Sequence, residues 1–322
     1  MRIARAVAAV VLACCFVGYA GAVWIWTPET GKWVNPKWAP RETAEEQLEW
    51  AASFEGAGDY KRAAKEYEKL VRRFPDSVHA PEAQFRAGRC YEELNKYAAA
   101  AEAYRKVVEL YPSSPNIAAA RQAQLRLGET IAEGEGSGVV GSAWERLAHG
   151  SRYERAAKVY QGIVAEAPYS EMAPDALMRL GHVYMKGGDY LMAAWAFQQI
   201  ADRYPGTPEA EEAIYWIAES HAARSLPPSY DQSATDEAIK AFGFYLTAYP
   251  TGRFADDAKG RLALLRAKRA ESLLIVARFY ERKGSISAAR VYYEDILRDW
   301  ADTPAAEDAR ACLAVIEGAS PQ

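Results

Sequence analysis

The side chains best suited to chemistry are a few histidines and cysteines. The four histidines are His79, His149, His182 and His221. A metal centre needs several such ligands at short, regular spacing, and no histidine here has a second histidine or a cysteine at such a spacing. The sequence therefore predicts no metal centre and no cofactor.

Other catalytic patterns are also missing from the sequence. Gly134, Gly136 and Gly138 follow no predicted strand, so they indicate a flexible insertion and not a phosphate-binding loop. No Gly-x-Ser-x-Gly nucleophile motif is present. The acidic pairs Glu92-Glu93 and Asp256-Asp257 are adjacent in sequence, so their carboxylates point to different sides of a helix. We therefore predict that the protein is not an enzyme.

The elements that would position any site form an internal repeat, in which an alanine is followed by apolar residues after four and seven positions. A proline follows after twelve positions in every unit but the last, which has Ala301 there. The units are Ala63-Tyr67-Leu70-Pro75, Ala100-Tyr104-Val107-Pro112, Ala156-Tyr160-Ile163-Pro168, Ala193-Phe197-Ile200-Pro205, Ala238-Phe242-Tyr245-Pro250 and Ala289-Tyr293-Ile296. We call the alanine, aromatic and aliphatic positions the ladder residues. Repeats of this size indicate a solenoid of helix pairs.

One unit shows how the helices of a pair should meet. Phe85, Gly88 and Tyr91 share one face of a first helix, and Ala100 and Tyr104 share one face of a second helix. Gly88 and Ala100 are small where the helices cross, so Tyr104 can fill the space beside them. The predicted fold is an all-α solenoid of about six tetratricopeptide-like hairpins over residues 41–318, with a C-terminal capping helix.

The repeat spacing is 37 residues between the first two units and departs from this in three places. Two departures indicate insertions, near residues 133–150 and 224–234. The third indicates a long first helix from Phe254 to about Lys283, because helix-favouring residues dominate and proline is absent. Ala305 to Ile316 should form the capping helix.

The N-terminus resembles an export signal, with two arginines followed by an uncharged stretch from Ala6 to Trp26. Three fates remain open for residues 1–22: cleavage after Ala22, lipidation of Cys14 in the sequence Val-Leu-Ala-Cys, or retention as an anchor. Each one places the solenoid across the inner membrane. Residues 23–40 contain four tryptophans and a glycine turn, which predict a linker with a small β-hairpin.

The amino-acid composition limits the kinds of partner that the protein is expected to bind. The chain has 39 basic and 43 acidic residues, a net charge of −4, which argues against nucleic-acid binding. The basic run Arg261, Arg266, Lys268 and Arg269 is expected to be a solvated helix face. Cys90 and Cys312 lie several repeats apart, so we expect two unpaired thiols.

The candidate binding surface is the face of the first helices that points away from their hairpin partners. The position after each crossing residue, and the position four residues earlier, should form a polar and an apolar stripe suited to an extended or amphipathic peptide. The predicted groove residues are Leu48, Phe85, Arg89, Leu125, Glu129, Met178, His182, Tyr215, Glu219 and Arg278. Leu274 continues the apolar stripe.

The turns between units resemble those of a known family. Aromatic-Pro-x-Ser/Thr turns followed by Ala-x-x-Ala, in 37-residue units, are similar to the outer-membrane assembly lipoproteins related to BamD. The most similar stretch is Val276–Tyr280 with Gly284, Ala288-Ala289 and Asp302–Ala306. The resemblance covers roughly Glu42 to Ile316. The two insertions, the tryptophan-rich segment and the ambiguous lipidation motif depart from the family pattern.

The resemblance implies a non-enzymatic scaffold at the periplasmic face of the outer membrane. Early repeats would face unfolded β-barrel precursors, and later repeats would face the barrel-forming subunit of the assembly machinery. The alternative is a periplasmic tetratricopeptide adaptor that coordinates cell-envelope or division complexes, because its repeats would look much the same.

Overall fold

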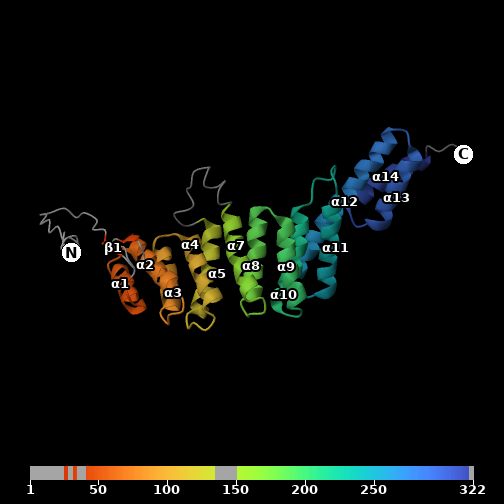
Figure 1. The fold of residues 1–322 in the computed structure, drawn as a ribbon. Coiled ribbons are helices and arrows are strands. Elements are labelled where there is room, and N and C mark those ends of the chain that lie inside the picture. Colours follow the sequence, from red (N-terminus) through yellow and green to blue (C-terminus); the bar gives the residue numbers. More distant parts are fainter. Residues whose placement is uncertain (1–24, 28–31, 35–40, 135–150, 319–322) are drawn as a thin grey trace, which may run out of the picture.

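The computed structural model describes residues 25–27, 32–34, 41–134 and 151–318. Within these ranges the chain forms six helical hairpins and a final helix, arranged in a row with α1 and α14 at opposite ends (Figure 1). The hairpins are α1 (Ala44–Gly56) with α2 (Tyr60–Arg73), α3 (Ala80–Glu93) with α4 (Tyr97–Leu110), α5 (Ile117–Glu133) with α7 (Arg152–Glu166), α8 (Ala173–Gly187) with α9 (Tyr190–Arg203), α10 (Pro208–Ala223) with α11 (Ser233–Ala248), and α12 (Ala255–Arg282) with α13 (Ile286–Asp299). The final helix is α14 (Pro304–Gly318). The predicted α-solenoid with a capping helix is confirmed.

Two short strands precede the array. β1 (Ile25–Thr27) pairs antiparallel with β2 (Lys32–Val34), and Ile25 lies opposite Val34. These strands match the hairpin expected in the tryptophan-rich segment. The export segment 1–22 with Cys14, and the inserted residues 135–150, lie outside the described residues.

The ladder residues form the core of every hairpin. Each of these alanine, aromatic and aliphatic side chains is at most 2% exposed. Burying a large apolar side chain contributes about 1.5–3 kcal/mol, so six repeats of this set account for much of the stability of the array. The spacing in the sequence therefore identified the packed seam.

Glycines at the helix crossings allow the aromatic ladder residues to fit. A Cβ atom at Gly88 would lie 2.7 Å from the ring of Tyr104, and one at Gly128 would lie 2.6 Å from the ring of Tyr160. At Gly181 a Cβ atom would lie closer still, to Phe197. Such separations are far below van der Waals contact, so glycine is required where these helices meet.

Helix ends follow local sequence signals. Thr43 and Ser151 each form a capping box with a glutamate three residues later, at the starts of α1 and α7. Pro208 occupies the first turn of α10, where its missing N–H costs nothing. These signals fix the hairpin boundaries that position the first helices.

α12 links two parts of the array. Its first half packs in a core cluster with α10 and α11 through Leu262 and Leu265, and its second half packs with α13 and α14 through Leu274 and Ala277. In Figure 1, α13 and α14 lie beyond the row of earlier hairpins and are reached along α12. The predicted long first helix is confirmed.

The sequence suggested that the basic run on α12 forms a solvated helix face. The structure contradicts this, because these side chains bind groups on neighbouring elements. Arg261 pairs with Glu219 of α10, Arg269 pairs with Asp236 of α11, and Arg266 pairs with Asp302 before α14. Lys268 donates to Ser225 Oγ. These side chains anchor α12 to its neighbours because acidic and hydroxyl partners lie on the adjacent elements. Within the described residues, no helix has the length and apolarity needed to span a bilayer.

Candidate protein-binding groove

The first helices of neighbouring hairpins share two hollows. The smaller lies between α3 and α5, encloses about 320 Å³, and has Tyr104 of α4 in its lining. The larger involves α5, α8 and α10 and encloses about 650 Å³. Because successive first helices line both hollows, we call this surface the first-helix face.

Five of the predicted groove residues line these hollows. Phe85 and Arg89 line the smaller one. Glu129, Met178 and His182 line the larger one. Phe85 and Met178 are half-buried and Arg89 and Glu129 are exposed, so both hollows combine apolar and charged surface.

The other predicted residues lie elsewhere. Leu48 packs against the core cluster of the first hairpins, and Leu125 packs against that of the central ones; both are half-buried. Arg278 is exposed and pairs with Asp308 of α14 at 2.9 Å, so it belongs to the C-terminal hairpin. The structure therefore does not bring all ten residues together in one groove.

The prediction that Tyr215 faces the groove is wrong. Its side chain is buried and stacks on Phe254, with ring centroids 4.5 Å apart. Its hydroxyl donates to Asp257 and lies 3.2 Å from a carboxylate oxygen of Glu219. Leu274 is also buried, in the cluster formed with α13 and α14. The start of α12 covers Tyr215, through Phe254 and Asp257, and α13 and α14 cover Leu274.

Glu219 is largely shielded as a result. It pairs with Arg261 at 3.0 Å, and only 13% of its side chain is exposed. Burial raises the pKa of this carboxyl, and the Arg261 guanidinium opposes that rise. Glu219 therefore joins α10 to α12 and offers little surface to a ligand.

Ion pairs connect most neighbouring first helices across this face. Four of the pairs join a carboxylate on one hairpin to an arginine on the next, and the fifth joins α12 to the final helix α14. The pairs are Glu55–Arg86 (3.5 Å), Glu92–Arg126 (2.7 Å), Glu129–Arg179 (2.9 Å), Glu219–Arg261 (3.0 Å) and Asp308–Arg278 (2.9 Å). These pairs keep the polar stripe close to neutral and link the hairpins in sequence.

The junction of α8 and α10 is different because aromatic rings meet there. His182 packs edge-on against Trp216 with ring centroids 4.6 Å apart and an interplanar angle of 88°. His182 also contacts Phe197 at 5.4 Å. Burial lowers the pKa of the His182 imidazole, and Lys186 adds to this, while Glu212 opposes it. This junction therefore gives the larger hollow an aromatic wall.

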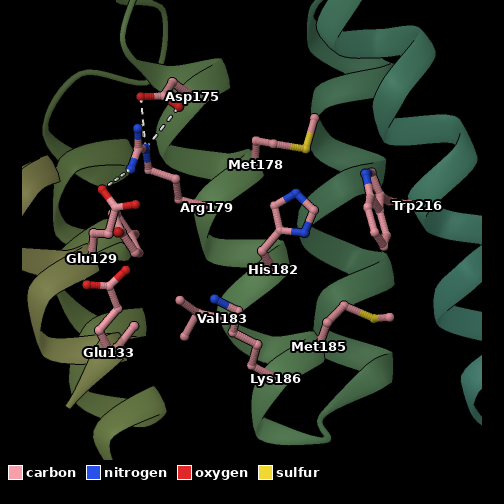
Figure 2. A pocket seen from close by; sticks show the side chains of 12 residues that line it. Glu129, Glu133, Asp175, Met178, Arg179, His182, Val183, Met185, Lys186 and Trp216 are labelled. Carbon is pink, nitrogen blue, oxygen red and sulfur yellow. Dashed lines mark hydrogen bonds and ion pairs between the residues drawn. The ribbon is translucent and has the colours of Figure 1, made fainter. Parts of the chain in front are cut away.

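Figure 2 shows how the side chains of the larger hollow are distributed. Arg179 reaches both Asp175 on its own helix and Glu129 on α5. On the other side of α8, Met178, His182 and Met185 point toward Trp216 of α10. The hollow thus has a charged side next to α5 and an aromatic and thioether side next to α10.

Several lining residues were not predicted from the sequence, although a signal for them exists. Arg126 and Arg179 each stand two positions before the glycine at a helix crossing, and Trp216 holds the same place in the next repeat. Arg86, which pairs with Glu55, also has this position. The two predicted stripes lie one position after the crossing residue and four positions before that one. A third stripe, two positions before the crossing residue, identifies Arg86, Arg126 and Arg179, three of the five arginines that pair across the face.

Comparisons with known proteins show which family the chain resembles. A family model described as an outer membrane lipoprotein (YfiO) matches residues 141–317, and a tetratricopeptide-repeat model matches residues 48–115. The MamA crystal structure aligns over 65% of this chain and 93% of MamA, at 20% identity and a TM-score of 0.32.

Curated relatives agree with the lipoprotein model. The outer membrane protein assembly factor BamD of Caulobacter vibrioides is 26% identical over 45% of this chain and 47% of its own length. The factor of the same name from Neisseria meningitidis serogroup A is 25% identical over 51% of this chain and 65% of its own length. The chain thus spans about half to two thirds of the relatives it matches. Because the lipoprotein model covers more than half of the chain and falls on its repeat hairpins, this protein belongs to the YfiO family of outer membrane lipoproteins.

Proposed function

We propose that this protein is a non-enzymatic scaffold of the machinery that assembles β-barrel proteins in the outer membrane. The observation that carries the proposal is the match of the lipoprotein family model to residues 141–317, together with relatives named as outer membrane protein assembly factors. The hollows on the first-helix face supply a surface for the binding that such a scaffold needs.

The first-helix face suits an extended or amphipathic chain. Phe85 and Met178 provide half-buried apolar contacts, and Arg89 and Glu129 provide exposed charges beside them. Apolar burial supplies affinity for such a peptide, and nearby charges set its register and direction. Binding would therefore need no covalent chemistry.

Two partners are proposed for different parts of the array. The α3–α5 hollow, with Phe85 and Arg89, would receive unfolded β-barrel precursors. The C-terminal hairpin, where Arg278 is exposed, would contact the barrel-forming subunit. This division separates a surface for transient clients from one for a stable partner.

Site-specific photocrosslinking in cells tests this assignment. A photoreactive residue at Phe85 or Arg89 should trap β-barrel precursors, and one at Arg278 should trap the barrel-forming subunit. The matched control is Gln198, which is exposed on second helix α9 and should trap neither. Capture of division or envelope-constriction proteins at Phe85 and Arg278, without any barrel protein, would overturn the proposal in favour of the adaptor alternative.

We also propose that the solenoid acts at the periplasmic face of the outer membrane, with Cys14 as the candidate lipid attachment site. Palmitate labelling of the full chain and of Cys14→Ala tests the anchor. Label that is lost with the substitution supports lipidation. Label absent from both proteins supports cleavage after Ala22 or a retained anchor, which the mass of the mature N-terminus separates.

A further inference from the structure

Thioether side chains are concentrated in one repeat of the chain. Four of the five methionines lie at positions 172, 178, 185 and 192. Two of them, Met178 and Met185, flank His182 on α8 and line the larger hollow. Residues four before and three after a helical position lie on its face of the helix.

The helix spacing allows these three side chains to converge. At a rise of 1.5 Å per residue, Met178 lies about 6 Å and Met185 about 4.5 Å from His182 along the helix axis. A methionine side chain is flexible, so both thioethers can reach the imidazole from opposite sides. Figure 2 shows the two thioethers above and below the His182 ring, on the side of α8 that faces α10.

Trp216 completes the arrangement from α10. Its ring lies edge-to-face with His182 at 4.6 Å, and its Nε1 donates to Glu212 at 3.3 Å. An indole ring attracts a nearby cation through its electron-rich face, and the Glu212 carboxylate adds negative charge. A cation held at His182 would thus have an aromatic ring beside it.

The donor set favours a soft metal. Thioether sulfur and neutral imidazole bind Cu(I) and Ag(I) well, whereas Mg²⁺ and Ca²⁺ prefer oxygen ligands. Within the described ranges, no group of three or more His, Cys, Asp or Glu side chains could hold a metal ion. Histidine and cysteine spacing therefore gave no sign of such a site, because two of its three donors are methionines.

We propose that Met178, His182 and Met185 form a binding site for a soft monovalent cation, Cu(I) or Ag(I), with Trp216 packed beside the ion. Ser220 Oγ donates to the Trp216 carbonyl at 2.7 Å and lies 3.2 Å from Met185 Sδ, so only a weak contact holds the thioether and Met185 can turn toward the metal. The site goes beyond the scaffold function and does not depend on it.

The proposal is tested with Ag⁺ and the full chain carrying ¹³C-methyl methionine. One equivalent of Ag⁺ should shift the methyl signals of Met178 and Met185, while those of Met172 and Met192 serve as internal controls. Met178→Leu and His182→Gln should each weaken binding at least tenfold. The matched controls Met192→Leu and His221→Gln should bind as the parent does.

Ag⁺ also binds thiols, so the titration is repeated with all four cysteines replaced by alanine. This distinguishes binding at the proposed site from binding to cysteine. Retained binding with the same methyl shifts supports the site. Binding that disappears with the cysteines, or unmoved Met178 and Met185 signals, overturns it. Circular dichroism of each variant establishes folding. If His182→Gln fails to fold, Met185→Leu provides the same test without removing the ring that contacts Trp216.

Discussion

The hydroxyl of Tyr104 on α4 donates a 2.5 Å hydrogen bond to the Glu92 carboxylate on α3. The same bond, across the same separation of 12 residues, joins Tyr67 to Glu55 and Tyr293 to Glu281. Glu92 also pairs with Arg126 of the next hairpin at 2.7 Å. A single carboxylate therefore connects the two helices of its own repeat and the first helix of the following one.

Replacing Tyr104 by phenylalanine tests how much this hydrogen bond contributes to stability. The Tyr104→Phe variant should lower the free energy of unfolding by about 1–2 kcal/mol, because a buried hydrogen bond to a charged group is lost. Urea denaturation measures the change. The control is Tyr97→Phe on the same helix, whose exposed hydroxyl donates to Asn95. Equal effects of the two substitutions would contradict the role given to Glu92.

The glycine at the α8–α9 crossing should not tolerate a methyl group. Gly181→Ala places a Cβ atom against the Phe197 ring and should destabilise the protein by about 1–3 kcal/mol. Gly243→Ala, in the interior of α11, meets no atom within 4 Å and should stabilise by up to about 1 kcal/mol. Thermal melts of both variants compare the two effects. The prediction fails if both substitutions shift the melting temperature in the same direction.

Glu166 at the end of α7 should make stability depend on pH. Neither of its carboxylate oxygens has a hydrogen-bond partner among the described residues. Burial raises its pKa from 4.5 to about 7, a rise that Glu109 adds to and Arg105 opposes. A pKa raised in the folded state means that the folded protein holds the proton more tightly. Stability is therefore full below pH 4.5 and is lost as the pH rises toward 7.

Glu166→Gln should remove this loss. The variant should match the parent near pH 4.5 and be more stable by on the order of 2 kcal/mol at pH 8, where the parent buries a charge. Urea denaturation at both pH values measures the difference. Exposed Glu171 provides the control, since Glu171→Gln should leave the pH dependence unchanged. A parent and a Glu166→Gln variant with parallel pH profiles would refute the prediction.

Cys90 should resist alkylation in the folded protein. Its side chain is 1% exposed, and burial raises the pKa of the thiol to about 12. At pH 8 the reactive thiolate is then about one part in ten thousand. Iodoacetamide followed by peptide mapping should find Cys312 modified first and Cys90 modified only in denaturant. Equal rates at Cys90 and Cys312 would show that the first hairpins open readily.

Local patterns predicted the fold well because a repeat array is built from contacts between near neighbours. The offsets from Ala100 to Tyr104 and Val107 identified buried residues correctly, and Gly88 was correctly assigned to the crossing beside Tyr104. The boundaries of the long helix α12 were also predicted, because its sequence lacks proline and is rich in helix-favouring residues. Each of these inferences needed only one hairpin.

The site was predicted less completely because it depends on how hairpins lie relative to each other. Phe85, Arg89, Glu129, Met178 and His182 line hollows as expected, but Tyr215 is buried against Phe254 at the start of α12. Arg126 and Arg179 were missed since their partners belong to other repeats.

The sequence alone determined the repeat, its core and the absence of familiar catalytic motifs, because side-chain periodicity fixes which face of a helix is buried. Only the tertiary structure decided which first-helix residues pair across hairpins. It also decided that Met178, His182 and Met185 meet Trp216, which is more than thirty positions away. Packing angles between successive hairpins place these groups together, and those angles depend on many small contacts that no single motif encodes.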